Sequence, residues 1–349
     1  MIKDKALNLR LYSLLGDLDR ILMQGDVADI PPTLAQVVEQ FQRVIGGGGN
    51  PINASFREAF DDFIKSECTR LGWSPQTLRR NRTNLACALN YAPHLRMVDI
   101  TASWYAEYYA YLLQQYKAST LQRKVGDFRR IITWCQKHGY YNGDALDYEP
   151  TVIGASNVNE PFYLTVDEVR SIEQHKWTAS QQALERVADC FVFCCYTGLR
   201  HSDLKQLEPF MIYDDGIHLT TEKTHVPVSI PLNDHSRRIL QKYDYKLPVI
   251  SNQKGNDAIK VVARICGIDA PYTETYFKGG TRHTHTAPKH EVITWHDSRR
   301  TFVTLAATLG IDANVIIKFT GHASTQQLRP YLAIAEKLKQ DNMSRFNNI

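Results

Sequence analysis

Four consecutive glycines at positions 46–49 divide the chain and constrain its fold more than any other feature. Glycine has no Cβ and loses the most backbone entropy on ordering, so such a run cannot sustain a helix and is typical of a linker. Residues 143–161 are rich in Asn, Gly and Pro and indicate a second boundary. We therefore predict a helical N-terminal segment over 1–50, a first domain over 51–145 and a second domain over 160–349.

The first domain is predicted to be a compact, all-helical bundle. Apolar residues recur at helical spacing in four segments, each opened or flanked by Ser, Thr, Pro or Gly. These segments cover residues 55–71, 75–89, 102–116 and 119–137. Residues 9–44 show the same spacing, which predicts a helical preface before the first linker.

The second domain is predicted to be mainly helical with one short β-hairpin. Residues 164–169 have the pattern of a capped helix start. Residues 217–222 and 226–231 alternate or run apolar as strands do, on the two sides of Lys223. Helices are expected in the remainder, interrupted by a loop over residues 271–291.

Part of that expected loop is unusually basic. It carries Lys278, Arg282, His283, His285, Lys289 and His290 within residues 278–290. His283 and His285 could chelate a metal ion, but no Cys or carboxylate at ligand spacing accompanies them. We therefore predict a mobile basic loop that faces DNA or solvent, and no metal site.

Charge and cysteine content narrow the setting without deciding the function. The net charge of +4, from 41 Lys and Arg against 37 Asp and Glu, is too weak to indicate a nucleic-acid-binding protein by itself. Seven cysteines without a CxxC pair favour a reducing compartment. No stretch approaches the roughly 20 apolar residues that cross a bilayer, and the N-terminus lacks the apolar core of a signal peptide. We expect a cytoplasmic protein with no membrane partner.

Four short motifs contain the groups that phosphoryl transfer to a protein nucleophile requires. They are a TGLR sequence, a Lys-Thr pair, an HxxR sequence, and a TGH sequence followed nine residues later by tyrosine. The candidate catalytic residues are Arg200, Lys223, His296, Arg299, His322 and Tyr331. Each residue alone has an ordinary explanation as a surface or packing side chain, so the prediction depends on their joint occurrence in this order.

Each residue type suits a step at a phosphodiester. The guanidinium groups of Arg200 and Arg299 match phosphate geometry and stay charged, so they can stabilise the oxygens that gain negative charge. His296 lies three residues before Arg299, and on one helix the two side chains would share a face. His322 follows a glycine, which permits a close backbone approach. Tyr331 supplies a phenol oxygen as a covalent nucleophile.

This ordered set resembles the tyrosine recombinase, or phage integrase, family, whose catalytic domain carries Arg, Lys, HxxR, His or Trp, and Tyr. The resemblance covers about residues 160–345 and extends more loosely over the preceding domain. It implies a mainly α protein: a helical core-binding (SAM-like) domain, then a mainly helical catalytic domain with a small antiparallel β-sheet. It also implies site-specific DNA recombination through a 3′-phosphotyrosine and a Holliday junction, without cofactor or metal.

The resemblance also singles out one lysine and two departures. Lys223 is the candidate general acid, because it alone precedes Thr and an apolar run as the family's hairpin lysine does. Its competitors are Lys205, Lys254 and Lys260. Ser298 stands in HxxR where the family usually has an apolar residue, and Asp203 stands where Glu is more common. Neither departure removes a reacting group.

Basic residues of the first domain are candidate phosphate contacts, since the resemblance implies that a basic helix there faces DNA. They are Arg79, Arg80, Arg82, Lys117, Arg123, Lys124, Arg129 and Arg130. A solvated helix face is the alternative explanation. The expected partners are double-stranded DNA, a homotetramer when DNA is synapsed, and accessory DNA-bending or directionality proteins. Two rival functions are a type IB topoisomerase-like relaxing enzyme and a DNA-binding factor without chemistry.

Overall fold

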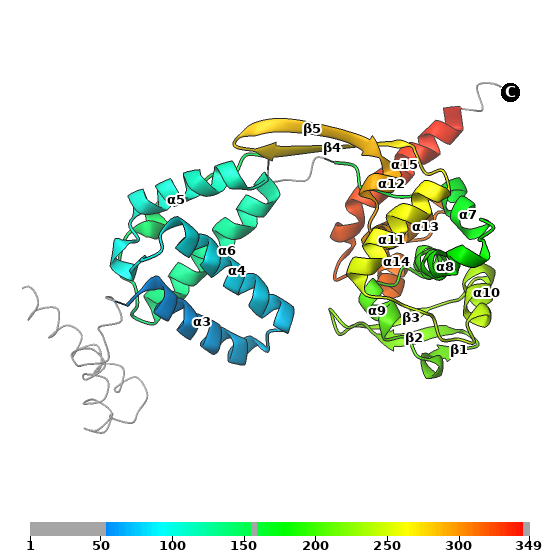
Figure 1. The fold of residues 1–349 in the computed structure, drawn as a ribbon, viewed down its shortest axis with the longest axis horizontal. Coiled ribbons are helices and arrows are strands. Elements are labelled where there is room, and N and C mark those ends of the chain that lie inside the picture. Colours follow the sequence, from blue (N-terminus) through cyan, green and yellow to red (C-terminus); the bar gives the residue numbers. More distant parts are fainter. Residues whose placement is uncertain (1–53, 155–158, 345–349) are drawn as a thin grey trace, which may run out of the picture. The chain divides into compact units, whose positions relative to one another are not determined.

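A computed structural model describes residues 54–154 and 159–344, which form two compact units (Figure 1). Unit 1 contains residues 54–154 together with Tyr276–His283, and unit 2 contains the other described residues. The predicted helical segment over 1–50 lies outside the described residues. Both units are mainly helical with small antiparallel sheets, which confirms the predicted fold class. No described helix is both long and apolar enough to span a bilayer.

The four predicted helices of unit 1 are present, and their ends differ from the prediction by at most two residues. They are α3 (Phe56–Leu71), α4 (Pro75–Tyr91), α5 (Ala102–Gln115) and α6 (Ala118–Lys137). Helix α3 begins at a capping box, in which Ser55 and Glu58 bond to each other's backbone amides. Helix α5 begins where the Thr101 side chain accepts a bond from the Trp104 amide. Short 3₁₀ turns, Met97–Asp99 and Ala145–Asp147, join the bundle.

Aromatic side chains form the core of unit 1. Phe56, Phe60 and Phe63 line one face of α3 and are almost completely buried. They pack with Phe128 of α6, which in turn lies 4.7 Å from the Tyr105 ring of α5, measured between ring centroids. Each such buried ring contributes roughly 1.5–3 kcal/mol relative to an exposed one. The bundle is therefore stable through packing along the apolar faces that the sequence pattern indicated.

The predicted loop over residues 271–291 is wrong, because a β-hairpin occupies most of it. Strands β4 (Pro271–Lys278) and β5 (Thr281–Pro288) pair with each other and are followed by the one-turn helix α12 (Lys289–Val292). Gly279 and Gly280 both have positive φ and form the turn between the strands. Most side chains of β5 are exposed, so the ribbon lacks the buried apolar face by which strands are recognised in a sequence.

The end of this hairpin belongs to unit 1. The Gly279 amide donates a hydrogen bond to the Leu113 carbonyl of α5, at 3.1 Å. Lys117, at the start of α6, pairs with Lys278 in an antiparallel bridge, and its ammonium lies 3.9 Å from the centre of the Tyr276 ring. These contacts hold the turn of the hairpin where α5 ends and α6 begins.

Unit 2 is organised around helix α8 (Gln182–Thr197), whose second half, residues 190–195, is apolar and buried on all sides. Figure 1 shows it surrounded by α7, α10, α11 and α13. These helices are α7 (Val166–Glu173), α10 (Asp234–Lys242), α11 (Asn252–Ile265) and α13 (His296–Thr308). The predicted capped start near residue 164 is confirmed, since Thr165 and Glu168 form a capping box before α7. The remaining helices are α9 (His201–Lys205), α14 (Ala313–Thr320) and α15 (Arg329–Ser344).

The predicted hairpin of this unit is also confirmed, as part of a three-stranded sheet. Strand β2 (Gly216–Thr220) pairs with β3 (Pro227–Ile230), with Leu219 opposite Val228. A third, two-residue strand, β1 (Ile212–Tyr213), adds to the other edge of β2 and was not predicted. The loop between β2 and β3 carries Lys223.

Candidate active site

The end of helix α8 places Arg200. Gly198 ends the helix at φ +71, and a Cβ there would lie 2.5 Å from the Phe302 ring, so both conformation and space require glycine. The chain then turns into α9, and the Arg200 side chain is only 16% exposed. Its guanidinium lies 3.6 Å from the Asp203 carboxylate and also donates to the Thr320 carbonyl.

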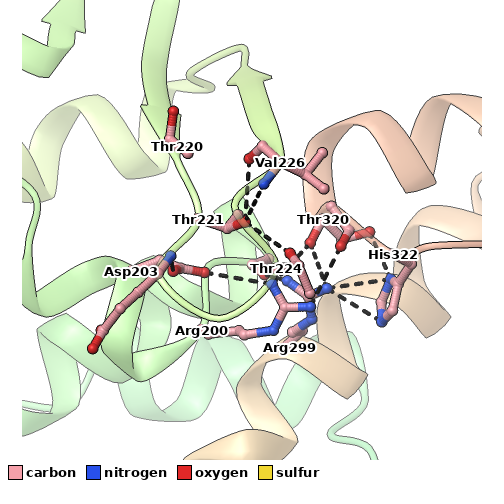
Figure 2. A network of polar contacts seen from close by, with 12 residues as sticks. Arg200, Asp203, Thr220, Thr221, Thr224, Val226, Arg299, Thr320 and His322 are labelled. Atoms are coloured by element: carbon pink, nitrogen blue, oxygen red, sulfur yellow. Dashed lines mark hydrogen bonds and ion pairs between the residues drawn. The ribbon is translucent and has the colours of Figure 1, made fainter. Parts of the chain in front are cut away.

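Arg299 lies at the centre of the site (Figure 2). It is 3% exposed and donates hydrogen bonds to the carbonyls of Gly198 and Thr320. Its second terminal nitrogen lies 3.2 Å from Nε2 of His322. Burial and the nearby Arg200 lower the pKa of Arg299 to about 9, so it remains a cation at neutral pH. Neutral carbonyls are its hydrogen-bond acceptors among the described residues, which leaves this buried charge suited to an anion.

His322 follows the end of α14, where Gly321 turns the chain at φ +60. A Cβ on Gly321 would lie 3.2 Å from Val228 and 3.3 Å from Thr221, so this turn packs tightly against the β2–β3 hairpin. Burial and the positive charges of Arg299 and Arg200 lower the pKa of His322 to about 3. The imidazole is therefore neutral in the protein without DNA.

His296 is the first residue of α13, one turn before Arg299, so the expected sharing of one helix is confirmed. The residue is exposed to solvent. Partial loss of hydration, followed by the charges of Arg300, Arg299, Arg200 and Lys223, lowers the pKa of His296 to about 4.

A buried carboxylate fixes the loop of Lys223. Asp203 is 1% exposed in its side chain, and it accepts a hydrogen bond of 2.9 Å from the Glu222 amide. The same carboxylate faces Arg200, so one side chain ties the arginine to the loop. Lys223 itself is exposed in the adjoining turn. The Asp that departs from the usual Glu thus has a defined structural task.

Tyr331 lies in the first turn of α15, where its ring packs against the apolar cluster that contains Val303, Ala307 and Leu328. Tyr331 also lies close to the Arg300 guanidinium: burial lowers the pKa of Arg300, but Asp297 and then Tyr331 raise it, and the net shift is upward. Arg300 is held by Asp297 at 2.8 Å, and Asp297 also accepts bonds from the amide and hydroxyl of Thr294. The structure therefore brings Arg200, His296, His322 and Tyr331 together around Arg299, and Lys223 lies exposed in the adjoining loop.

Three of these neighbours were not identified from the sequence: Thr320, Asp297 and Arg300. The i,i+3 spacing of Asp297 and Arg300 on one helix was a usable signal for an ion pair. Thr320 carried no signal beyond its place in the TGH motif. The departure at Ser298 is accommodated, because this buried hydroxyl donates to the Trp295 carbonyl at 2.7 Å.

The candidate DNA contacts of unit 1 fall into two groups. Exposed side chains are found at Arg79, Arg80, Arg82 and Arg123. Arg129 is half-buried and Arg130 is exposed, but both side chains make contacts within the unit. Arg129 donates to the carbonyls of Leu146 and Tyr148, and Arg130 bonds to Asn81 and lies over the Phe63 ring.

The two candidate lysines lie against aromatic rings, Lys117 over Tyr276 and Lys124 over Tyr116. His283, one of the two histidines considered for metal binding, stacks on Tyr276 as well. Within residues 54–154 and 159–344, no three His, Cys, Asp or Glu side chains form a group that could hold a metal ion.

Solved structures with a similar fold are tyrosine recombinases on DNA. A dimer of lambda integrase residues 75–356 bound to a COC′ core site has 16% identity and a TM-score of 0.62, covering 80% of this chain and 95% of that chain. A lambda integrase tetramer bound to a Holliday junction has 16% sequence identity and a TM-score of 0.63, and the match covers 86% of each chain. The post-cleavage complex of XerH recombinase with palindromic difH has 14% sequence identity and a TM-score of 0.59, and the match covers 96% of each chain. No curated protein sequence matches the chain.

Fold and residue pattern thus define a DNA recombinase of the tyrosine class. The family model described as the phage integrase family matches residues 163–337, about half of the chain. The chain therefore belongs to the phage integrase family, and it is a site-specific recombinase.

Proposed function

We propose that Tyr331 is the nucleophile of this recombinase. Its phenol oxygen attacks the scissile phosphorus and forms a 3′-phosphotyrosine, while the bond from phosphorus to the 5′ oxygen breaks. The 5′ hydroxyl, or one from a partner duplex, then attacks the phosphotyrosine and releases the phenol. Because each step exchanges one phosphoester for another, the reaction needs no external energy source and no cofactor.

The convergence of Arg200, Arg299 and His322 is the observation that carries this proposal. Two nearly buried guanidinium groups and an imidazole lie within one hydrogen-bonded network, and Tyr331 lies close enough to Arg299 and Arg300 to raise the pKa of both. Fixed cations in a partly dry site stabilise the negative charge that develops on the non-bridging oxygens. His296, at the start of the helix that carries Arg299, adds a further group facing the same phosphate.

Lys223 is the proposed general acid. Its loop is anchored by Asp203 but the ammonium is exposed, so it can reach a leaving group at the surface of the site. It would donate a proton to the departing 5′ oxygen. Competing lysines have no comparable anchor next to the arginines.

The proposed partner is double-stranded DNA, bound by unit 2 at the cleaved phosphate and by basic side chains of unit 1. Strand exchange between two duplexes needs four active sites, so we propose a homotetramer on synapsed DNA. The lambda integrase tetramer bound to a Holliday junction supports that assembly by similarity of fold. Accessory DNA-bending or directionality proteins are a further proposed partner.

The proposal is tested by trapping the covalent intermediate. A randomised pool of nicked duplexes, in which cleavage releases a short fragment that diffuses away, should yield a protein–DNA adduct stable to boiling in detergent. Peptide mapping should place the DNA on Tyr331. Tyr331→Phe, which keeps the ring and removes the attacking oxygen, should bind the selected duplex and form no adduct. An adduct in that variant would refute the assignment.

A further inference from the structure

Thr320 contacts three of the proposed catalytic residues, Arg200, Arg299 and His322. It is the last residue of α14 and only 1% exposed. Its carbonyl accepts hydrogen bonds from Arg299 and Arg200. Its hydroxyl lies 2.6 Å from the Ile316 carbonyl and 2.7 Å from Nδ1 of His322 (Figure 2).

The two hydroxyl contacts together determine where the protons lie. A carbonyl oxygen can only accept, so the contact with Ile316 uses the single proton of the Thr320 hydroxyl. If that proton pointed at His322 instead, two oxygens without a proton between them would face each other at 2.6 Å in a buried site. Both contacts are favourable only when the threonine oxygen accepts a bond from Nδ1–H of His322. Arg299 Nη2 lies 3.3 Å from Nδ1 and 3.2 Å from Nε2, and in this tautomer it donates to the lone pair of Nε2 until a phosphate arrives.

We infer that Thr320 is a positioning residue, which holds the His322 ring with its proton on Nδ1 and thereby presents Nε2 to the scissile phosphate. The inference rests on the proposed function, because it assigns that phosphate to this site. It adds a residue to the proposed site, because Thr320 acts through the His322 ring and supplies no group to the reaction itself.

The charges around the ring explain why a fixed tautomer matters. Burial, followed by the charges of Arg299 and Arg200, lowers the pKa of His322 and keeps the ring neutral in the free protein. A neutral Nε2 carries a lone pair that would repel a phosphate oxygen. The approaching phosphate therefore draws a solvent proton onto Nε2, and the imidazolium then donates one N–H to Thr320 and the other to the phosphate. Without the threonine oxygen, the Nδ1–H would be unpaired and the ring could turn or exchange its tautomer.

The tautomer can be measured without DNA and without activity. In the full chain labelled with ¹⁵N-histidine, the His322 signals are identified by their loss in His322→Gln. We expect Nδ1 protonated and Nε2 unprotonated in the natural chain and in Thr320→Ser, which keeps the hydroxyl. Thr320→Val keeps the shape of the side chain and should shift the proton to Nε2. A proton on Nε2 in the natural chain would overturn the inference.

Cleavage of the selected nicked duplex tests the consequence. Thr320→Val should slow single-turnover adduct formation roughly 10- to 100-fold, as loss of a histidine's orienting partner commonly does, and Thr320→Ser should restore most of the rate. The matched control is Thr304→Val. Thr304 is equally buried, lies on α13, and has a hydroxyl without a hydrogen-bond partner among the described residues. Its variant should cleave at the natural rate.

The outcomes separate this inference from the proposed function. If the natural chain forms no adduct through Tyr331, the proposed function fails, and the NMR measurement still decides the tautomer. If the adduct forms but Thr320→Val cleaves as fast as the natural chain, only the role of Thr320 is refuted. A drop in cleavage shared by Thr304→Val would also refute it, since any loss of a buried hydroxyl would then suffice.

Discussion

Arginines that bond to protein acceptors serve different purposes in the two units. In unit 1, Arg129 and Arg130 bond to carbonyls and to side-chain oxygens of neighbouring helices, and Arg130 has Asp127 at 3.3 Å. In unit 2, Arg299 is more deeply buried, and its acceptors are two carbonyls and an imidazole. Arg200 stands beside it with a carboxylate only at 3.6 Å. In unit 1 the positive charges are neutralised or hydrogen-bonded by nearby protein groups. In unit 2 two positive charges lie close together.

This difference shows how a catalytic arginine can be distinguished from a structural one. Burial of two like charges close together is unfavourable unless an anion joins them. In unit 2, Arg200 and Arg299 form such a pair of buried like charges near Tyr331. The described residues of unit 1 contain no such pair. If the paired arginines of unit 2 are catalytic and the hydrogen-bonded arginines of unit 1 are structural, substitutions in the two units should have different effects on cleavage.

Lys223 is an exception to the rule that catalytic cations are buried, because it is exposed and yet proposed to be catalytic. Lys223→Ala should slow cleavage by roughly 10²- to 10⁴-fold, the usual range for a general acid, with little change in DNA binding. Replacing the bridging 5′ oxygen by sulfur should restore the rate, since a thiolate leaves without a proton. Single-turnover cleavage of both substrates measures this. If sulfur gives no rescue, another group donates the proton.

Arg299 and Arg130 sharpen the comparison directly. Arg299→Gln should slow cleavage about 10²- to 10³-fold on either substrate, because its charge acts on the non-bridging oxygens, which sulfur at the leaving position does not relieve. Arg130→Gln should leave the cleavage rate of the folded protein unchanged and lower the stability of unit 1 by about 1–2 kcal/mol through lost hydrogen bonds. Equal kinetic effects of the two variants would remove the distinction.

How far the sequence predicted this arrangement depends on the kind of signal. The helices of unit 1 were predictable because Phe56, Phe60 and Phe63 repeat at helical spacing. The site was predictable because its motifs occur in a fixed order. The β4–β5 hairpin was not, because a two-stranded ribbon without a buried face leaves no apolar alternation. Nor could the sequence show that Arg123 is exposed whereas Arg129 bonds to backbone carbonyls. Both residues lie in the same basic helix, and only the fold determines which groups lie beside each of them.

Acid should affect unit 2 in particular. The pKa values of His296 and His322, about 4 and about 3, lie below the 6.5 of an ordinary histidine. Between these values the unfolded chain binds more protons than the folded one, so the stability is complete above pH 6.5 and falls as the pH drops toward 4. His322→Gln should reduce this loss by about 1–2 kcal/mol, allowing for partial solvent access. Denaturant unfolding at several pH values measures it, with His94→Gln in unit 1 as the control. Identical pH slopes for all three proteins would contradict the assignment.

The smallest expected effect divides the basic residues of unit 1 themselves. Arg79 and Arg82 lie three residues apart on α4 and are exposed, so they can reach phosphates, whereas Arg129 and Arg130 are bonded internally. Each phosphate contact releases about one counterion, so neutralising Arg79 and Arg82 together should flatten the dependence of log affinity on log salt by about two units, for all DNA sequences alike. Neutralising Arg129 and Arg130 should leave that slope unchanged while lowering stability. The measurement is a salt titration of binding with the Tyr331→Phe background, which prevents covalent capture from distorting the equilibrium. If the second pair changed the slope and the first did not, unit 1 would bind DNA through the side that packs its helices, and the contrast between satisfied and available charge would fail in this unit.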